Sequence, residues 1–388
     1  MADRTYDLVL FGATGFTGSL TAEYLARHAP ERMRWALAGR DRDKLESVRN
    51  RLAELDPAYS DLGLITADVT DPTSMRRMAE QARVVISTVG PFLEYGDPVV
   101  KACAEAGTDY VDLTGEPEFV DRVYLDHHAT ACGTGARIVH ACGFDSVPHD
   151  LGVYFTVQQL PEGVPIHVDG YVRSGGSFSG GTFHSAVNAM SRGRRMLSVT
   201  RQRRAREPRP ARRRVSGRAG RPHRCDDPRG WALPLPTIDP QVVARSGRAL
   251  DRYGPDFSYR HHALVKKLPV AVGVVAAAGA VLALAQLSPT RRMLLSRISP
   301  GEGPGPRRRA RSWFTVRFVG TAGGQRVVTE VAGGDPGYDE TAKMLAESAL
   351  CLAFDDNPAT CGQTTTAAAM GDNLLRRLVD AGIRMRVL

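Results

Sequence analysis

The sequence lacks the cysteine patterns of disulfide-rich and zinc-binding proteins. Its six cysteines form no C-x-x-C pair, and no group of cysteine and histidine has zinc-finger spacing. We therefore expect reduced thiols, no metal site and a cytoplasmic protein. A signal-peptide pattern is also missing, because Asp3, Arg4 and Asp7 precede only a short apolar run of the kind that forms a strand.

Acidic residues are scarce in one part of the chain, and this shortage accounts for the net charge. The chain has 51 Lys and Arg against 42 Asp and Glu, a net charge of +9. Residues 192–229 hold 15 arginines and three acidic residues, so this segment carries +12 and the remainder −3. The segment has no aromatic side chains that could stack on bases, so we do not expect a nucleic-acid partner. The Arg- and Pro-rich residues 192–231 show almost no apolar periodicity, which predicts disorder there.

The first 143 residues alternate apolar runs with helical patterns. Runs typical of buried parallel strands lie at residues 6–11, 33–38, 62–67, 84–89, 110–113 and 137–141. Short helical segments between them indicate an α/β fold with a Rossmann-type doubly wound parallel sheet.

The rhythm changes after Gly143. Helices are expected at 144–160, 182–197, 338–353 and 364–381, and strands at 166–173, 313–320 and 326–332. We therefore predict one domain over residues 1–143 and a second, α+β domain over 144–388 that serves substrate binding or oligomerisation. A homodimer stays open.

One apolar segment, residues 268–287, is long enough to cross a bilayer. Basic residues at both ends, Lys267 and Arg291 among them, give it no preferred orientation. A single span would place residues 313–388 on the far side of the membrane, although their pattern is that of elements completing the second domain. We therefore favour a membrane-surface or buried helix over a span.

A glycine-rich loop follows the first predicted strand and opens a helix. Gly12, Gly15 and Gly18 have the roles known for dinucleotide-binding loops: a tight turn, close approach of the backbone to the pyrophosphate, and close packing of helix on strand. The helix N-terminus then offers N–H groups to the phosphates. The context of strand, loop, helix and further βα units supports a dinucleotide site, and the whole loop reads Gly12-Ala13-Thr14-Gly15-Phe16-Thr17-Gly18.

The second strand ends in a residue that favours NADP(H) over NAD(H). An NAD site would carry an acidic residue there, but this chain has Arg40, with Lys44 one turn into the next helix. The neighbouring Asp41 is the feature that argues against this preference. Ligands of such sheets bind outside the carboxyl ends of the strands, so further cofactor contacts are expected at Asp68, Val69, Ser87, Thr88, Val89, Gly90 and Pro91.

These motifs resemble those of the saccharopine dehydrogenase-like oxidoreductases, and within that group the actinobacterial trans-acting enoyl reductases. The resemblance implies NADPH-dependent reduction of an acyl or polyketide thioester, carried on a carrier protein, in the synthesis of cell-envelope lipids such as phthiocerol and phenolphthiocerol esters. It does not extend across the Arg/Pro segment. The residues that carry it are Gly12 to Gly18, Ala38-Gly39-Arg40, Val89 to Phe92, Tyr110 to Glu116, Gly143 to Pro148 and Gly333 to Tyr338.

Enoyl reduction requires a hydride donor, a group that holds the thioester oxygen, and an acid for the α-carbon. We take Tyr95, Asp145 and His149 as the catalytic candidates; Asp112, Glu116 and His184 are weaker ones. Structural roles compete with these. Asp145 with Ser146 could cap the next helix, and Tyr95 and His149 could serve packing. The Tyr-x-x-x-Lys pair of short-chain dehydrogenases is missing after the fourth strand, which disfavours that mechanism.

Two other functions stay open. One is an NADP-binding regulator or membrane-associated protein without catalysis, which would bind cofactor and turn nothing over. The other is an anionic-membrane or nucleic-acid binder that works through the Arg segment. A lipid substrate would give the apolar segment a purpose, so we expect a cytoplasmic protein peripheral to the inner face of the plasma membrane.

Overall fold

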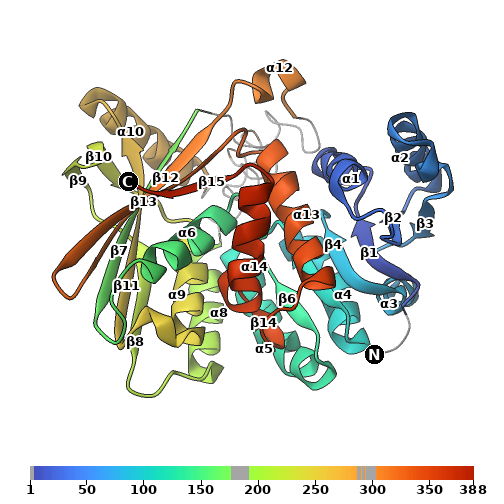
Figure 1. Cartoon of the computed structure of the whole chain (residues 1–388), viewed down its shortest axis with the longest axis horizontal. Helices are drawn as coiled ribbons and strands as arrows, with labels where there is room; N and C mark the ends of the chain where they lie inside the picture. The colour runs from blue at the N-terminus through green and yellow to red at the C-terminus, as the bar shows by residue number, and fades with distance from the viewer. Residues whose placement is uncertain (1–3, 176–191, 286–289, 291–292, 294–302) are drawn as a thin grey trace. The chain divides into compact units, whose positions relative to one another are not determined.

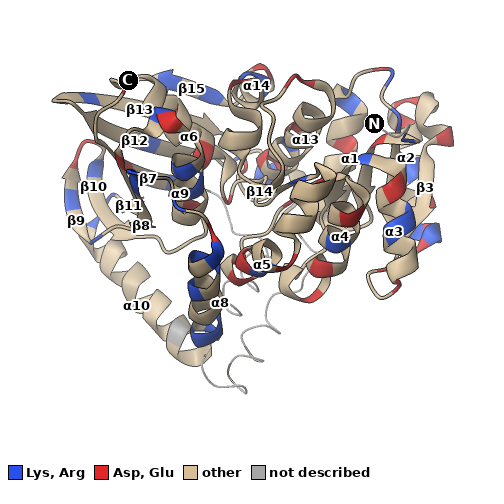
Figure 2. Cartoon of the chain, turned by 90° about the horizontal axis from the view of Figure 1, so that it is seen from below, with Lys and Arg blue, Asp and Glu red and all other residues tan. Residues whose placement is uncertain are grey.

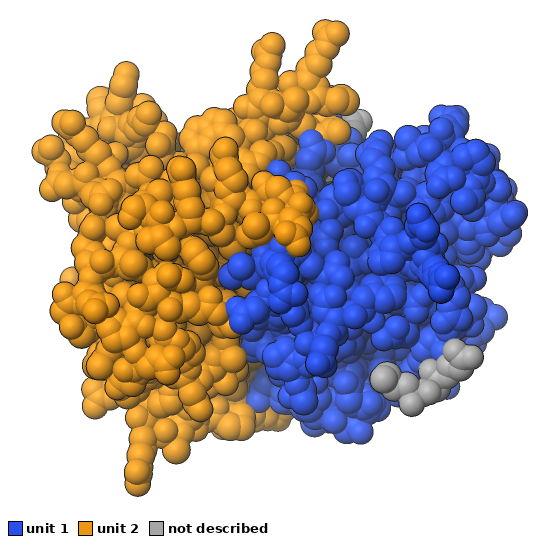
Figure 3. All heavy atoms as spheres, viewed as in Figure 1, with its two compact units in different colours: residues 1–143, 301–303, 338–378 blue, residues 144–300, 304–337, 379–388 orange. Residues whose placement is uncertain are grey.

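A computed structural model describes residues 4–175, 192–285, 290, 293 and 303–388 (Figure 1; Figure 2). The chain divides into two compact units, coloured separately in Figure 3. The first unit combines residues 1–143, 301–303 and 338–378, and the second combines 144–300, 304–337 and 379–388.

The first unit contains a parallel sheet of seven strands in the order β14-β6-β5-β4-β1-β2-β3. Strand β1 lies between β4 and β2, so the strand order reverses at β1, which is where such sheets bind dinucleotides. The Rossmann-type sheet is therefore confirmed. Its strands are β1 (Tyr6–Phe11), β2 (Trp35–Gly39), β3 (Gly63–Thr66), β4 (Ala82–Ser87), β5 (Asp109–Asp112), β6 (Arg137–Val139) and β14 (Gly362–Thr364).

The helices of the first unit begin at residues suited to capping. The carboxylate of Asp41 accepts from the backbone N–H of Lys44 at the start of α2, and Asp71 accepts from Thr73 at the start of α3. The helices are α1 (Phe16–His28), α2 (Arg42–Leu55), α3 (Pro72–Gln81), α4 (Phe92–Ala106), α5 (Pro117–Thr134), α13 (Asp339–Phe354) and α14 (Thr366–Asp380), with the 3-10 turn η1 (Pro57–Asp61).

The C-terminal part of the chain departs from the predicted domain division. We assigned all of residues 144–388 to the second domain, but 338–378 belong to the first unit. Strand β14 extends the parallel sheet beside β6, and α13 packs on β4, β5 and α1. Helix α13 is buried along most of its length, which explains why its sequence carries apolar residues on nearly every face.

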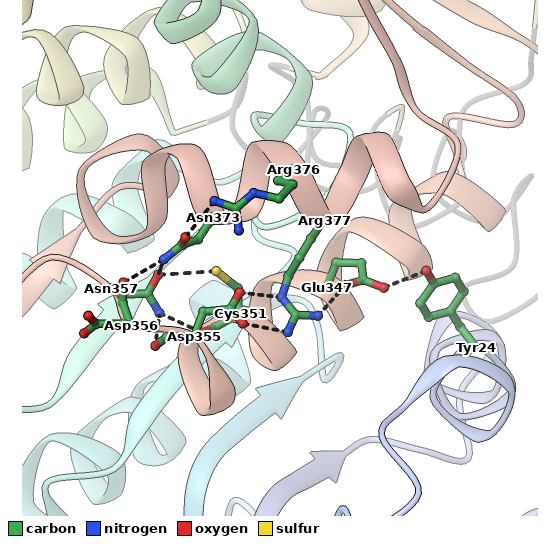
Figure 4. A network of polar contacts seen from close by, with 9 residues as sticks. All are labelled: Tyr24, Glu347, Cys351, Asp355, Asp356, Asn357, Asn373, Arg376 and Arg377. Carbon is green, nitrogen blue, oxygen red and sulfur yellow. Dashed lines mark hydrogen bonds and ion pairs between the residues drawn. The ribbon is translucent and has the colours of Figure 1, made fainter.

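A polar network holds these C-terminal helices in the first unit (Figure 4). The guanidinium of Arg377 on α14 forms a two-pronged pair with Asp355, at 2.5 and 2.8 Å, and lies 3.2 Å from Glu347 of α13. The hydroxyl of Tyr24 on α1 donates to the other oxygen of Glu347 at 2.7 Å. One arginine thus joins α14 and α13, and through Glu347 it reaches α1.

The second unit is built on a mixed sheet in the order β15-β13-β12-β7-β11-β10-β9, with β8 also paired to β11. Helices α6 and α9 cover one face of it, where Gly152 of α6 lets the ring of Phe318 approach closely. The strands are β7 (Ile166–Ser174), β8 (Arg214–Ala219), β9 (His223–Asp226), β10 (Arg229–Pro234), β11 (Asp256–Val265), β12 (Phe314–Ala322), β13 (Gln325–Gly333) and β15 (Arg384–Val387). The helices are α6 (Val147–Gln158), α8 (Gly193–Arg206), α9 (Asp239–Ala249), α10 (Leu268–Ala285) and α12 (Pro306–Arg309), with the 3-10 turn η2 (Asp251–Tyr253).

The predicted disorder over residues 192–231 is wrong, because this segment forms α8, β8, β9 and the start of β10. Strand β8 pairs with β11 over six residues, and Cys225 and Ala232 join a small core with Tyr171 and Leu264. An arginine supplies part of the cohesion: the Arg213 guanidinium donates to three backbone carbonyls at 2.7–3.0 Å. Most of the helix predicted over 182–197, with His184, lies outside the described residues.

The apolar segment forms helix α10, which is long and apolar enough to cross a membrane by length and composition alone. It is not a buried helix, since Val270, Val272 and Val275 are 52–60% exposed. Strand β7 precedes α10 in the chain and β12 follows it, yet the two pair side by side over nine residues. A single crossing at α10 would separate these strands, so the structure excludes a simple span.

Replacing Arg377 by alanine should destabilise the protein by about 2 kcal/mol, because Asp355 and Glu347 lose a charged partner in a half-buried site. Urea unfolding followed by circular dichroism measures this. The control is Arg376→Ala on the same turn, whose exposed guanidinium donates to Asn373 at 3.4 Å and whose loss should cost under about 0.5 kcal/mol. Equal effects of the two variants would contradict the assigned role.

The same variant should change the acid sensitivity of the fold. Burial alone would raise the pKa of Asp355, but the hydrogen bonds and charge of Arg377 hold it below its usual range. A carboxylate with a lowered folded pKa stabilises the protein above its unfolded pKa, about 3.9, and loses that contribution as the pH falls through the folded value. The stability difference between wild type and Arg377→Ala should therefore shrink in acid.

Candidate functional site

The glycine-rich loop between β1 and α1 has the geometry that its sequence predicts. Gly12 has a φ of +89°, a left-handed conformation that side chains disfavour. A Cβ on Gly18 would lie 2.1 Å from the carbonyl oxygen of Gly12, so only glycine lets α1 start this close to β1. Thr88, just after β4, holds the loop in place, because its hydroxyl donates to the Gly12 carbonyl at 3.1 Å.

The start of α1 is open to an anion. Gly15 is the N-cap residue, no side chain caps the helix, and its first turn contains no acidic residue. Thr14 and Gly15 are exposed at the tip of the loop, while Ala13 is buried beneath them. A Cβ on Gly15 would meet only the Gly12 carbonyl, at 3.4 Å. The loop therefore presents backbone and a positive helix end where a pyrophosphate would sit.

Arg40 follows directly after β2, at the position where the sequence predicts a contact with the 2′-phosphate. Asp41 could have indicated a carboxylate that binds the ribose, but its side chain makes two other contacts. It caps α2 at 3.1 Å from the Lys44 N–H and pairs with the Lys44 ammonium at 3.4 Å. Lys44 is thus paired with Asp41 at the surface, whereas exposed Arg40 forms no ion pair with any residue that the structure describes and acts only through its charge on Asp68. The hydrogen bond from the Lys44 backbone is the main cause that lowers the pKa of Asp41.

The remaining predicted cofactor residues lie at the carboxyl edge of the sheet. Asp68, beside Val69 and after β3, accepts from the N–H and hydroxyl of Thr70 at 2.8 and 2.7 Å. Its carboxylate is therefore held in a local turn. Ser87 ends β4, where its hydroxyl is fully buried near that of Tyr110. Thr88, Val89, Gly90 and Pro91 follow it and lead into α4.

Two of the weaker catalytic candidates have structural roles. Buried Asp112 accepts from the backbone of Thr114 and Ala141 and contacts His140 at 2.7 Å. Glu116 accepts from Phe92 and Leu93 and so caps α4. Tyr95 lies on the first turn of α4, just after Pro91, and is 40% exposed.

Asp145 and His149 belong to one charged cluster in the second unit. His149 Nδ1 lies 2.8 Å from Asp239 Oδ1, and His261 Nε2 lies 3.5 Å from Asp239 Oδ2. The hydroxyls of Thr237 and Tyr259 contact Asp239 and His261, respectively. The three residues of the His149–Asp239–His261 cluster are fully buried, whereas Asp145 beside them is partly buried. Ser146 forms no side-chain cap on α6, so the capping role considered for this pair is not observed.

Electrostatics separates the two carboxyl groups of this site. Burial, and then the charge of Asp239, raises the pKa of Asp145 to about 6, against a smaller opposing effect of His149. Burial would also raise the pKa of Asp239, but His149, His261 and Thr237 hold it below its usual value. Burial lowers the pKa of His261 to about 3, so this ring is neutral at pH 7. Such divergent carboxyl groups are typical of acid–base sites.

The cluster also has residue types that can bind a metal, and ligand atoms of its three members lie within 4.8 Å of one another. His149 Nδ1 lies 2.8 Å from Asp239 Oδ1, yet these two atoms and His261 Nε2 form no hydrogen bond among the described residues. Asp239 also accepts the Thr237 hydroxyl on its other oxygen. The remaining oxygen Oδ1 and the two ring nitrogens thus face one another in a buried site that could hold a metal ion.

Sequence reasoning missed Asp239 and His261. Asp239 is followed by a proline, which suggests only a helix start, and His261 sits in an alternating strand beside a second histidine. Residue 261 lies more than one hundred positions from His149 along the chain, and no local pattern joins them. The sequence does contain one indication of their role. Asp239 and His261 are polar residues on a helix and a strand whose other inward positions belong to the core.

Known proteins resemble this chain in sequence. Residues 8–138 match the family described as the saccharopine dehydrogenase NADP binding domain. A Mycobacterium tuberculosis protein named as a candidate trans-acting enoyl reductase is 39% identical over 416 residues, which cover 99% of this chain and 97% of that protein. A second protein of that species, named trans-acting enoyl reductase, is 38% identical over 417 residues, covering 99% of this chain and 98% of its own.

The solved structures show the fold. Apo saccharopine dehydrogenase (L-Glu forming) from Saccharomyces cerevisiae aligns with a TM-score of 0.58 at 13% identity, covering 99% of this chain and 100% of that one. At this identity the likeness concerns architecture and not substrate.

Two glycine variants should separate folding from cofactor binding. Gly15→Ala adds a methyl group that the protein can hold but a pyrophosphate cannot, so the dissociation constant of NADPH should rise at least about tenfold. Its melting temperature without cofactor should stay within a few degrees of wild type. Gly18→Ala drives a methyl group into the Gly12 carbonyl and should reduce folded protein itself. Nicotinamide fluorescence and thermal melts measure both, and unchanged NADPH binding by Gly15→Ala would contradict the assignment.

Proposed function

The chain belongs to the family of the trans-acting enoyl reductases, as its motifs predict, and on this premise we propose that it reduces the carbon–carbon double bond of an acyl or polyketide thioester. It is an NADP-dependent oxidoreductase with a saccharopine dehydrogenase-type NADP-binding domain. The observation that carries the proposal is similarity over nearly the full length to relatives with that name, joined to an intact dinucleotide loop.

The residues present fit the cofactor. The uncapped start of α1 would hold the pyrophosphate, and exposed Arg40 would bind the 2′-phosphate as a fork-shaped donor. When bound, NADPH would supply the hydride for the β-carbon of the enoyl group. The chain itself must then provide a proton for the α-carbon and a donor to the thioester oxygen.

Asp145 is the acid we favour. Its chain position is just past β6, at the start of the second unit. The raised pKa of about 6 leaves a useful fraction protonated near neutrality. Behind it, His149 and Asp239 set the charge that Asp145 experiences and act as positioning residues. Tyr95, exposed after Pro91, stays a predicted donor to the thioester oxygen.

A lipid substrate is consistent with helix α10. An exposed apolar helix in the second unit favours attachment at a membrane surface, since α10 cannot carry the chain across in a single pass. We therefore place the reaction in lipid biosynthesis, at the cytoplasmic face of the membrane, with the thioester on a carrier protein.

A second function, an NADP-binding regulator without catalysis, would share the loop and Arg40. It predicts cofactor binding with no turnover of any enoyl thioester, and no role for Asp145. The unusual environment of Asp145 favours the enzyme.

Arg40→Ala should raise the dissociation constant of NADPH about 10- to 100-fold and leave that of NADH nearly unchanged, because only NADPH carries the 2′-phosphate. Titration of nicotinamide fluorescence with both cofactors measures this. The matched control is Lys44→Ala, whose ammonium is already paired with Asp41 and whose loss should change NADPH affinity far less. Equal losses of affinity for NADPH and NADH would contradict the proposed contact between Arg40 and the 2′-phosphate.

Asp145→Asn should lower kcat for 2-enoyl thioesters by a factor of about 10² or more, while the NADPH dissociation constant stays unchanged. In wild type, the acid works when protonated, so kcat/KM should decline as the pH rises above about 6. His149→Gln removes a group that lowers the pKa of Asp145 and should move this decline to higher pH. Asp239→Asn removes a group that raises it and should move the decline to lower pH. Shifts in the same direction for both variants would refute this arrangement.

A further inference from the structure

A second charged site in the second unit is separate from the Asp145 cluster. It is a pocket of about 570 Å³ that the proposed reaction does not use. Its polar lining carries three guanidinium groups, two imidazoles and one carboxylate. These belong to Arg218, Arg221, Arg260, His223, His262 and Asp169.

Strand register explains how the charges gather. Arg260 of β11 lies directly opposite Asp169 of β7 on one side and Arg218 of β8 on the other. Residues paired across neighbouring strands project from the same face, so these three side chains form a row. Alternation along β11 sends His261 to the opposite face, into the cluster with His149. The two charged sites thus lie on opposite faces of one sheet.

The row is unfavourable for the protein alone. Like charges directly opposite on neighbouring strands destabilise a sheet, and Arg218 faces Arg260 in this way. Asp169 offsets part of this repulsion, since the charge of Arg260 helps to lower its pKa, while its Oδ2 pairs with His167 Nε2 at 2.9 Å. None of the three arginines of the pocket forms an ion pair within the part of the chain that the structure describes. Charge repulsion that does not stabilise the fold is typical of binding sites.

The pocket walls are preformed. The His262 ring stacks on Tyr171 at 5.1 Å and meets His223 edge-on at 5.0 Å. A Cβ on Gly220 would lie 1.7 Å from His262 Nε2, so the loop can approach this ring only because residue 220 is glycine. His262 is 1% exposed, and its Nδ1 has no hydrogen-bond partner among the described residues. A pocket that joins this stacked histidine wall to three exposed arginines suits a phosphate group.

The helix that follows β11 in the chain indicates where that phosphate comes from. Strand β11, which supplies Arg260 and His262, leads through Lys266 and Lys267 directly into α10. Figure 2 shows α10 without acidic or basic residues, and its valines are exposed. An apolar helix beside basic residues is the arrangement that binds anionic membranes.

We propose that this pocket binds the phosphate of an anionic phospholipid headgroup while α10 lies in the membrane surface. The inference rests on the proposed membrane attachment and adds a lipid preference to it. It does not depend on the enoyl substrate or on Asp145.

Vesicle flotation of the full chain tests the proposal, with phosphatidylcholine alone and with added phosphatidylglycerol. Wild type should bind the phosphatidylglycerol vesicles at least about tenfold more tightly. Arg260→Gln should abolish most of this preference. The matched control is Arg224→Gln on β9, an exposed arginine that pairs with Asp226 at 3.7 Å and does not line the pocket. Loss of one generic surface charge should weaken binding only about fivefold.

Equal losses for Arg260→Gln and Arg224→Gln would overturn the pocket and leave simple charge attraction. Millimolar inorganic phosphate could instead compete for the pocket while Arg260→Gln leaves vesicle binding unchanged. This combination would mean a soluble phosphate ligand and would overturn the lipid source. Val272→Asp with Val275→Asp should weaken binding to both vesicle types, because it disrupts the apolar face of α10. Wild type that ignores all vesicles would overturn the inference and the membrane attachment together, while NADPH turnover would still test the reductase.

Thermal melts guard against a purely structural role. Arg218→Gln relieves the repulsion from Arg260 and should keep or raise the melting temperature. A fall of many degrees would mean that the row holds the sheet together, which contradicts the proposal.

Discussion

The closeness of α1 to β1 is the constraint on which the rest of the first unit depends. The Gly12 carbonyl occupies the space where any larger residue at position 18 would place its Cβ. This contact aims the uncapped helix end past Gly15 at the edge where β1 separates β4 from β2. A helix displaced by even one methyl group would turn its N–H groups and its dipole away from the pyrophosphate. The sheet order, the loop and cofactor binding are thus aspects of one close contact.

Local patterns predicted what local physics determines. The six strands of residues 1–143, the loop and the cation at Arg40 all follow from short-range rules on periodicity, glycine and charge. The return of residues 338–378 to the first unit could not be predicted in this way. It depends on β14 finding the edge of β6 and on the pairing of Arg377 with Asp355, which are contacts between segments distant in sequence.

The Arg-rich segment shows why composition alone misled the prediction. Low hydrophobicity and high charge predict disorder when a segment must build its own core. Here β8 adds to the edge of β11, and Cys225 needs only a small share of a core that other strands supply. Arg203 and Arg213 are held by Glu207 and by backbone carbonyls, so part of the charge is neutralised inside the fold. A contact between distant segments also decides how α10 can meet a membrane. Strands β7 and β12, which come before and after α10 in the chain, pair with each other, so α10 is not a single span.

Strand β11 shows how one run of residues can serve two sites. Its alternation points His261 toward α6 and α9, where burial keeps the ring neutral beside Asp239, and points Arg260 and His262 toward the other face. A shift of one residue in register would exchange these side chains and bury a guanidinium beside His149. The nine-residue pairing of β7 with β12 and the seven-residue pairing of β7 with β11 prevent such a slip. The register of this sheet therefore determines which charged side chains reach each of the two sites. The site on one face depends on the side chains of the other face being in their places.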